Sequence, residues 1–125
     1  MIDNPPLLTI HRGHRRPDPR LIEAFRGAQT SHLVDAMGGR GALDHRIKPM
    51  DPDNAAFVGP ALTALSYPAD VVGVFGAMAE AQPGDVVVIA NDAYTATAVV
   101  GDIVAGMMKN KGIAAFVTDG LARDR

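Results

Sequence analysis

The sequence predicts an α/β fold that ends in a βαβ unit. Two short apolar runs, 86–90 and 113–118, are rich in β-branched residues and are too short for helices, which is typical of strands buried on both faces. The stretch between them has a helical pattern and ends with lysines and Gly112, as helix C-termini commonly do. Strand, helix and strand within about thirty residues form a βαβ unit, whose two strands are parallel.

The composition predicts one domain preceded by an arm. The chain has 125 residues and is 47% apolar, which suits a single core. Residues 1–17 are rich in proline and arginine and show no sustained period, so we expect an N-terminal arm there and a single α/β domain of catalytic type at 18–125. A net charge of −2 argues against the basic surface that nucleic-acid-binding proteins usually carry.

The residue types that are missing exclude several kinds of site. The chain has no cysteine, so disulfides, thiolate-bound zinc and a cysteine nucleophile are excluded. No run reaches the roughly 18 apolar residues of a membrane-spanning helix, and the first residues lack the basic and apolar regions of a secretory signal. We therefore expect a cytoplasmic protein with no membrane partner and no nucleic-acid partner.

Two short helices are predicted at the start of the domain. Asp18 and Pro19 provide a cap and a first-turn proline for a helix that stops before a glycine. Thr30 or Ser31 caps a second helix over 30–37, which a pair of glycines ends. Each helix places its apolar residues on one face.

The middle of the chain predicts two strands and a helix. A brief strand is expected at 47–50 and a longer one at 57–67, where a Gly-Pro pair near the start suggests an edge or a bulge. Asp70 then caps a helix that runs through Ala81, and a Gln-Pro-Gly sequence ends it.

The start of the helix inside the βαβ unit is open. Thr95 and Thr97 are good caps, but a start there would place Gly101 in the helix interior at a cost of roughly 1 kcal/mol relative to alanine. A start near Gly101 removes that cost and leaves the N–H groups of 101–104 free to bind an anion. In the alternative interpretation Gly101 only permits close helix packing, and Asp102 is a first-turn acid that the helix dipole favours.

The last residues of the chain carry a chemical signal. Asp119 and Gly120 end the final strand in a turn, and Arg123 and Asp124 follow at once. Ligands of open α/β sheets bind at the carboxyl ends of strands. The carboxylate of Asp124 is a hard ligand suited to Mg²⁺ or Mn²⁺, and the guanidinium fork of Arg123 suits a carboxylate or an enolate oxygen. An Arg-Asp pair after a turn is, however, more often a solvated surface pair.

Six segments of the chain form a recognisable set. They read Ser-His-Leu-Val-Asp at 31–35, Gly-Ala-Leu-Asp at 41–44 followed by Ile47, Val-Gly-Pro-Ala-Leu-Thr at 58–63, Pro-Gly-Asp-Val at 83–86, Gly-Asp at 101–102 and Asp-Gly-Leu-Ala-Arg-Asp at 119–124. In this order and spacing, over about three quarters of the chain, the sequence resembles the class II pyruvate aldolases of the 4-hydroxy-4-methyl-2-oxoglutarate/4-carboxy-4-hydroxy-2-oxoadipate type. It equally resembles their relatives, the regulators of ribonuclease activity A.

The resemblance implies a fold, an assembly and a site. The fold would be a swivelling β/β/α-type domain like that of the regulator of ribonuclease activity A, assembled as a homotrimer or a dimer of trimers with the active site at a subunit interface. Asp124 would hold a divalent metal, Mg²⁺ or Mn²⁺, largely through waters. Arg123 would contact the pyruvoyl oxygens, and Asp102 would position a water for proton transfer, which makes these two the catalytic residues. The substrate-binding residues would be Gly101, Asp102, Ile103, Val104 and Arg123.

The function implied by the resemblance is that of a metal-dependent lyase. It would cleave 2-oxo diacids such as 4-hydroxy-4-methyl-2-oxoglutarate to pyruvate and would also decarboxylate oxaloacetate, so its partner would be a small 2-oxo acid. The alternative is a non-catalytic protein that binds and regulates a ribonuclease. Family members continue past the Arg-Asp pair, so the resemblance also implies a domain that is incomplete at its C-terminus and a partner acid outside it. Ala115 stands where many members have glycine, and 91–94 replaces a more glycine-rich loop.

Overall fold

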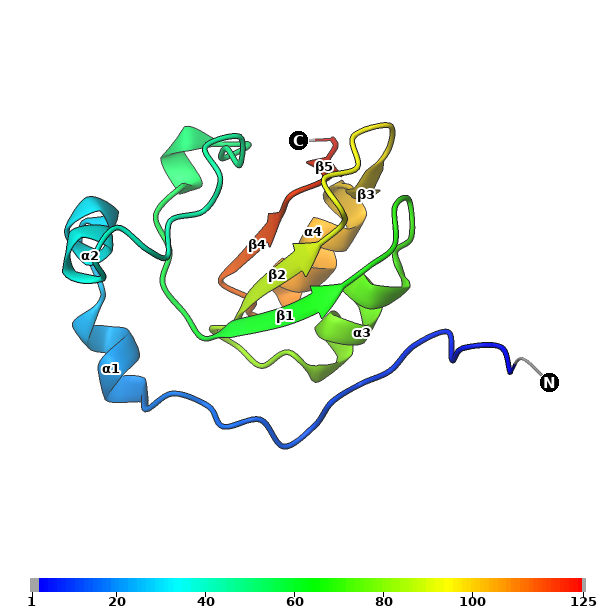
Figure 1. Cartoon of the computed structure of the whole chain (residues 1–125), viewed down its shortest axis with the longest axis horizontal. Helices are drawn as coiled ribbons and strands as arrows, with labels where there is room; N and C mark the ends of the chain where they lie inside the picture. Colours follow the sequence, from blue (N-terminus) through cyan, green and yellow to red (C-terminus); the bar gives the residue numbers. More distant parts are fainter. Residues whose placement is uncertain (1–2, 125) are drawn as a thin grey trace.

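The computed structural model describes residues 3–124 and shows a small parallel sheet with helices packed on one face (Figure 1). The elements are α1 (Pro19–Ala24), α2 (Thr30–Ala36), the 3-10 helix η1 (Pro52–Asn54), β1 (Ala61–Leu65), α3 (Val72–Glu80), β2 (Val86–Ala90), β3 (Ala98–Val100), α4 (Asp102–Asn110), β4 (Ala115–Thr118) and β5 (Leu121–Ala122). The parallel strands β1, β2 and β4 form one sheet with β2 in the centre, while β3 and β5 form a separate parallel pair. Within the described residues, no helix is both long and apolar enough to cross a membrane.

The predicted βαβ unit is confirmed. β2 spans the predicted residues and pairs in parallel with β4, so that Val87 lies opposite Phe116. β4 starts two residues later than predicted and ends at the predicted Thr118. The helices α3 and α4 connect neighbouring parallel strands and both lie behind the sheet in Figure 1. This is expected when both connections have the same hand. The buried core between helices and sheet includes Val74, Ala77 and Met78 of α3, Val87 and Ile89 of β2, and Met108 of α4.

The sequence does not predict the strands β3 and β5. Of the two helix starts left open, the later one is observed, because α4 begins at Asp102 with Gly101 as its N-cap residue. The backbone of Gly101 is extended, so this glycine stays outside the helix and avoids the interior cost. Val99 and Val100, which lie on the apolar face of the expected helix, are instead buried in strand β3.

The two N-terminal helices form where the sequence predicts them, with one difference in capping. Asp18 caps α1, and its carboxylate accepts the backbone N–H of Arg20 at 2.8 Å. α2 is capped by Gln29 rather than by Thr30 or Ser31, and no cap side chain bonds its first N–H groups. Thr30 and Ser31 lie inside the helix because the extended backbone that a cap needs already occurs at Gln29.

The prediction of a strand at 47–50 is wrong. A turn over 44–47 comes first, closed by the N–H of Ile47, which donates to the carbonyl of Asp44 at 3.0 Å, and the residues after it form no regular structure up to a bend at Met50. The side chain of Arg46 donates to the Asp44 carboxylate at 2.9 Å and its backbone N–H does so at 2.8 Å, which together lower the pKa of Asp44 to about 2. A strand needs a neighbour to pair with, and this segment has none in the part of the chain that the structure describes.

The strand expected at 57–67 is present but shorter. Its ladder with β2 starts where the carbonyl of Pro60 accepts the N–H of Val86 at 2.8 Å, because proline has no N–H to extend the ladder further. It ends near Ser66, whose hydroxyl donates to the carbonyl of Asp70 at 2.8 Å and begins the turn into α3. The N-cap residue of α3 is Val71 rather than the predicted Asp70, although the Asp70 carboxylate accepts the N–H of Val72, the first residue of the helix, at 2.9 Å.

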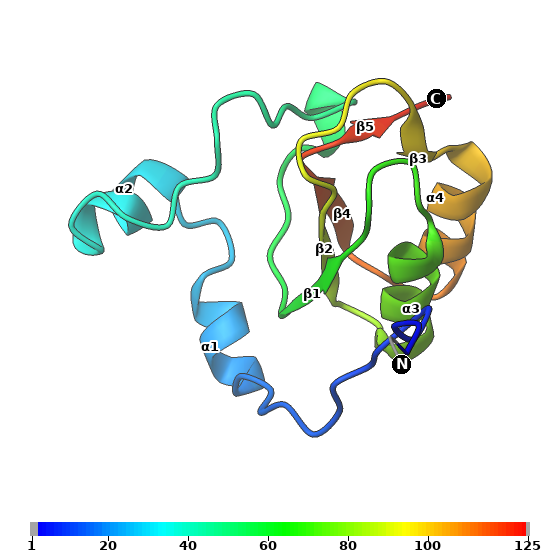
Figure 2. The same ribbon diagram turned by 45° about the vertical axis from the view of Figure 1, so that its right-hand side comes forward.

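The residues of the N-terminal arm run along α3 (Figure 2). Leu8 packs so closely on Gly76 that a side-chain carbon on that glycine would lie 2.9 Å from a Leu8 methyl group. Further along the arm, Arg12 pairs with Glu80 near the end of α3 at 2.7 Å. The arm is therefore ordered by packing on the crossover helix.

The last contact of the arm is a buried ion pair. Asp85, just before β2, is completely buried, and the guanidinium of Arg16 donates to both of its carboxylate oxygens. The backbone N–H of Gln82 donates to the same carboxylate at 2.9 Å. Burial alone would raise the pKa of Asp85, but the hydrogen bonds from Arg16 and Gln82 together outweigh it and hold the pKa below its usual range.

Removing Arg16 should therefore destabilise the fold. We expect Arg16→Ala to lower the free energy of unfolding at pH 7 by about 2 kcal/mol, because the carboxylate of Asp85 is left buried and unpaired. The loss is smaller than for a fully buried pair because the Arg16 side chain is 32% exposed. Chemical denaturation measures it, and Arg12→Ala is the matched control, since it removes an exposed pair from the same arm.

The same pair makes a prediction about pH. The folded pKa of Asp85 lies below its unfolded value of about 4, so the stabilisation is complete above that pH and is lost as the pH falls through the folded pKa. The stability difference between wild type and Arg16→Ala should therefore shrink in acid. Equal losses for Arg16→Ala and Arg12→Ala, or a difference that persists unchanged in acid, would contradict the assignment.

Candidate functional site

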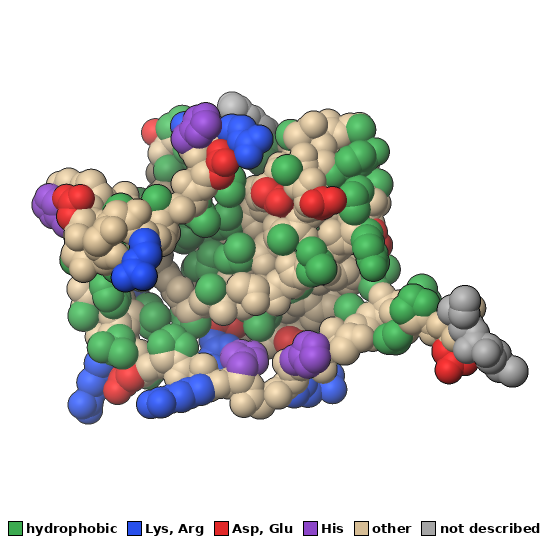
Figure 3. Space-filling model, in the orientation of Figure 1, with side chains coloured by type: hydrophobic (Ala, Val, Ile, Leu, Met, Phe, Trp, Pro, Cys, Tyr) green, Lys and Arg blue, Asp and Glu red, His purple; other side chains and the backbone are tan. Residues whose placement is uncertain are grey.

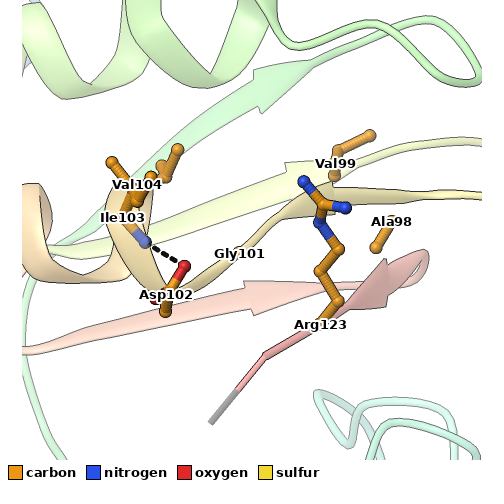
Figure 4. A pocket seen from close by; sticks show the side chains of 7 residues that line it. All are labelled: Ala98, Val99, Gly101, Asp102, Ile103, Val104 and Arg123. Carbon is orange, nitrogen blue, oxygen red and sulfur yellow. Dashed lines mark hydrogen bonds between the residues drawn. The ribbon is translucent and has the colours of Figure 1, made fainter.

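A pocket of about 230 Å³ lies where α4 begins, beside the paired strands β3 and β5 (Figure 4). The first two residues of β3, the cap and first turn of α4 and the residue after β5 line it, and these residues are Ala98, Val99, Gly101, Asp102, Ile103, Val104 and Arg123. The structure thus brings together every residue that the sequence proposes as substrate-binding. Ala98 and Val99, which belong to the unpredicted strand, complete the wall.

Arg123 is held in place by its backbone. Its N–H donates to the carbonyl of Val100 at 2.9 Å, which extends the pairing of β3 with β5 by one residue. The side chain is 71% exposed and rises along β3 toward Val99, with Asp102 on the other side of Gly101 (Figure 4). A fixed backbone with an exposed guanidinium suits a residue that binds an anionic ligand.

Asp124 adjoins the pocket without lining it. Its carboxylate lies 3.4 Å from Nε of Arg123, an ion pair with no hydrogen bond, and its side chain is 54% exposed. Its backbone is left-handed, with φ of 59°. Gly101 is packed against both side chains, because a side-chain carbon there would lie 3.1 Å from Oδ2 of Asp124 and 3.4 Å from Nε of Arg123.

The first turn of α4 supplies the positive end of a helix dipole. The first N–H groups of a helix have no intrahelical partner and favour an anion. In α4 the N–H of Ile103 donates to the carboxylate of Asp102 at 2.7 Å, so one of these groups already has a partner. Asp102 and Val104, whose N–H groups belong to this first turn, line the same pocket as Arg123. Both kinds of group favour an anionic ligand.

The donor set for a metal is small. No group of three or more histidine, aspartate or glutamate side chains gathers within 3–124 to hold an ion. Mg²⁺ and Mn²⁺ are hard cations, and Mg²⁺ commonly binds through one or two carboxylates while keeping several waters. Asp124, half exposed and beside the pocket, fits a site of that kind. The residues present are therefore compatible with a water-rich divalent site.

A larger cleft adjoins the pocket and shares Gly101 and Arg123 with it. Its volume is about 850 Å³, and it lies between residues 43–57 and the strands β4 and β5, with Asp124 in its wall. Figure 3 shows hydrophobic side chains gathered in the hollow between the first half of the chain and the sheet. Most of the charged side chains that are visible in that view lie outside this hollow. A ligand anchored at the pocket could extend into the cleft.

Sequence reasoning missed two residues beside the site. Asn91 and Asp119 follow β2 and β4, and from the sequence they serve only to stop these strands. In the structure the Asp119 carboxylate accepts the N–H of Asn91 at 2.5 Å. Their positions in the sequence are enough to predict this contact, because polar residues that directly follow two neighbouring parallel strands meet at the same edge of the sheet.

Comparison with known proteins decides the family. Residues 30–125 match the model of the RraA-like family, described as Aldolase/RraA. The chain belongs to this family. Over 103 residues it is 44% identical to a Halalkalibacterium halodurans protein named "Putative 4-hydroxy-4-methyl-2-oxoglutarate aldolase", and the match covers 82% of this chain and 49% of that protein.

Solved structures of RraA-like proteins confirm the fold. The structure of Streptomyces coelicolor RraAS2, titled an unusual member of the RNase ES inhibitor RraA family, superposes with a TM-score of 0.75 at 27% identity, over 90% of this chain and 58% of that one. An uncharacterised Pseudomonas syringae protein superposes with a TM-score of 0.73 at 24% identity, over 93% and 54%. The predicted mixed α/β fold of this family is thus correct, and the chain spans about half the length of the relatives it matches.

Substitutions at Gly101, the N-cap residue of α4, and at Gly106 inside this helix distinguish a change in the pocket from a change in stability. Gly101→Ala should shift the Nε–H resonance of Arg123 in nuclear magnetic resonance spectra, because the new methyl group meets Arg123 and Asp124. It should change stability little, since alanine tolerates the extended backbone at this position. Gly106→Ala has no atom within 4 Å of its new methyl group, so it should leave that resonance unmoved and stabilise the helix by up to about 1 kcal/mol. The reverse pattern of shifts would contradict the contacts described for Gly101.

Proposed function

We propose that the protein is a divalent-metal-dependent lyase that cleaves 2-oxo diacids of the 4-hydroxy-4-methyl-2-oxoglutarate type to pyruvate and also decarboxylates oxaloacetate. The observation that carries this proposal is the placement of Arg123 and the open first turn of α4 in one pocket. The family match and the name of the 44% identical relative support it.

The two reactions share one charged intermediate. In the aldol cleavage, a proton leaves the C4 hydroxyl, the C3–C4 bond breaks and its electron pair forms the enolate of pyruvate. In oxaloacetate the same bond breaks with release of CO₂, and the enolate again takes up the pair. Protonation at C3 completes pyruvate in both cases. A site that stabilises this enolate therefore accelerates both reactions.

Each residue of the site has its own role in this reaction. Arg123 binds the carboxylate of the 2-oxo acid and offsets the charge that develops on the enolate oxygen. The first-turn N–H groups of α4 bind the same end of the substrate from the other side. Asp102, exposed beside the pocket, holds a water that carries the proton. Asp124 holds Mg²⁺ or Mn²⁺, which when bound acts as a Lewis acid toward the 2-oxo acid.

A second candidate function comes from a different class. The similarity to a member of the RNase ES inhibitor family makes a non-catalytic protein that binds a ribonuclease a specific alternative. The two candidates separate cleanly, because only the lyase requires a metal and the Arg123 side chain. A fold shared by both cannot choose between them.

We also propose that the protein assembles as a homotrimer or a dimer of trimers. α1 and α2 have no buried residue and stand apart from the sheet in Figure 1. Phe25, at the C-cap of α1, and Met107 of α4 are about half exposed, and Ile103, which lines the pocket, is 76% exposed. Exposed apolar surface of this extent is typical of an interface. Light scattering at micromolar concentration measures the assembly, and a monodisperse monomer would exclude it.

The lyase proposal is tested by pyruvate release. Purified protein with oxaloacetate and Mg²⁺ or Mn²⁺ should release pyruvate faster than the metal alone does, as followed by a coupled lactate dehydrogenase assay. EDTA should abolish the enzymatic rate, and either metal should restore it. A rate equal to that of metal alone, together with binding to a ribonuclease, would favour the regulator.

Site variants assign the roles. Arg123→Ala should lower kcat/KM by about a hundredfold or more, as the loss of a donor to a developing oxyanion does elsewhere, with metal affinity roughly kept. Asp124→Asn should weaken metal binding and turnover together. Arg20→Ala, an exposed arginine on α1, is the control and should keep wild-type activity. Full activity in Arg123→Ala or in Asp124→Asn would show that the roles are wrong.

A further inference from the structure

We infer that Asp119 is a positioning residue of the candidate site. Its carboxylate holds the loop after β2 against the segment that carries Arg123, at the edge where the parallel strands end. Asp119 lines the larger cleft but not the small pocket that holds Arg123, so its action on that pocket runs through the backbone. Its role in turnover rests on the proposed function, whereas its role in placing Arg123 does not.

The carboxylate of Asp119 accepts two backbone hydrogen bonds from one short loop. Oδ1 accepts the N–H of Asn91 at 2.5 Å, and Oδ2 accepts the N–H of Ala93 at 2.9 Å. The N–H of Tyr94 closes the same loop by donating to the carbonyl of Asn91 at 3.2 Å. One side chain from the end of β4 thus spans the whole turn that follows β2.

This turn needs an external restraint. Asp92 and Ala93 are consecutive residues with φ of 56° and 50°, a left-handed conformation that side chains other than glycine disfavour. Such strain persists only where surrounding contacts fix it. The two hydrogen bonds to an ionised carboxylate are of the stronger, charge-assisted kind. Asp119 is therefore the group that holds the strained turn in its observed form.

Asn91 anchors the turn on its other side. Its side chain is completely buried, and its Nδ2 donates to the carbonyls of Tyr67 at 2.7 Å and Ser66 at 3.3 Å. Gly120 approaches so closely that a side-chain carbon there would lie 3.0 Å from Oδ1 of Asn91. The ends of β1, β2 and β4 are thus joined through Asn91 and Asp119.

Both segments that leave this cluster lead to the site. The loop after Asn91 runs into β3 and then to Gly101, while the residues after Asp119 form β5 and then Arg123. These two strands hold three and two residues, so their own pairing is weak. Loosening the turn lets β3 move relative to β5, and the Arg123 guanidinium moves relative to the first turn of α4. Misplacement of this kind lowers turnover without removing a catalytic group.

Asp119→Asn tests the inference, because it keeps the shape but replaces one accepting oxygen with an NH₂ group that faces a backbone N–H. Amide hydrogen exchange is measured by nuclear magnetic resonance well below the unfolding temperature. We expect the amides of Asn91 and Ala93 to exchange at least about tenfold faster, and the amide of Arg123 to follow, while β2 amides stay protected. Asp70→Asn is the matched control, since that carboxylate also caps a backbone N–H at the same edge of the sheet but leads to no site residue. It should leave the amide of Arg123 unchanged.

A second readout separates positioning from plain stability. In the oxaloacetate assay Asp119→Asn should lower kcat about ten- to a hundredfold. Adding Ala93→Gly should restore part of that loss, because glycine adopts the left-handed turn without strain.

Unchanged exchange at Arg123 in Asp119→Asn overturns the inference whatever the activity. Absence of turnover in the wild type overturns the proposed function alone, since exchange still decides the role of Asp119. Equally faster exchange across the whole sheet would show a general loss of stability and would also overturn the inference.

Discussion

The candidate site depends on the pairing of two very short strands. β3 leads into the first turn of α4, and β5 leads into Arg123, so the hydrogen bond from the N–H of Arg123 to the carbonyl of Val100 fixes the distance between them. Neither strand is long enough to hold this register alone. The register is maintained because Val99 and Val100 are buried in the core and because both strands start from a cluster of hydrogen bonds at the end of the main sheet.

This arrangement explains how a small pocket acquires its chemistry. The βαβ unit orients the N-terminus of α4 toward the edge where the strands end, and the returning segment places the Arg123 guanidinium in the same pocket, on the other side of Gly101. Gly101 lets the two approach, since any side chain there would meet Arg123 and Asp124. Positive groups from two sources thus line one pocket, an arrangement that suits the stabilisation of an enolate.

The sequence predicts the parts of this structure that have a local pattern. Strand β2 is five consecutive apolar residues bounded by turns, and it was placed correctly because length and periodicity suffice for such a segment. β3 and β5 were missed because two or three residues carry no period, and Val99 and Val100 fit the apolar face of a helix equally well. The prediction of a strand at 47–50 is wrong for the opposite reason, since a local apolar pattern does not supply a neighbouring strand to pair with. Arg123 is predicted from its place after a turn, whereas the bonds between Asp119 and the 91–93 loop join residues 28 and 26 positions apart and leave no local pattern in the sequence.

The convergence of Arg123 and the first turn of α4 on one anion is tested most directly with oxalate, a stable mimic of the enolate of pyruvate. Titration into ¹⁵N-labelled protein, with and without Mg²⁺, reports the amides of the first turn of α4 and the Nε–H of Arg123 separately. Saturable shifts of both sets with one common affinity are expected if a single ligand lies between them. Shifts at Arg123 alone, or no shift at either set at saturating oxalate and Mg²⁺, would contradict the site described here.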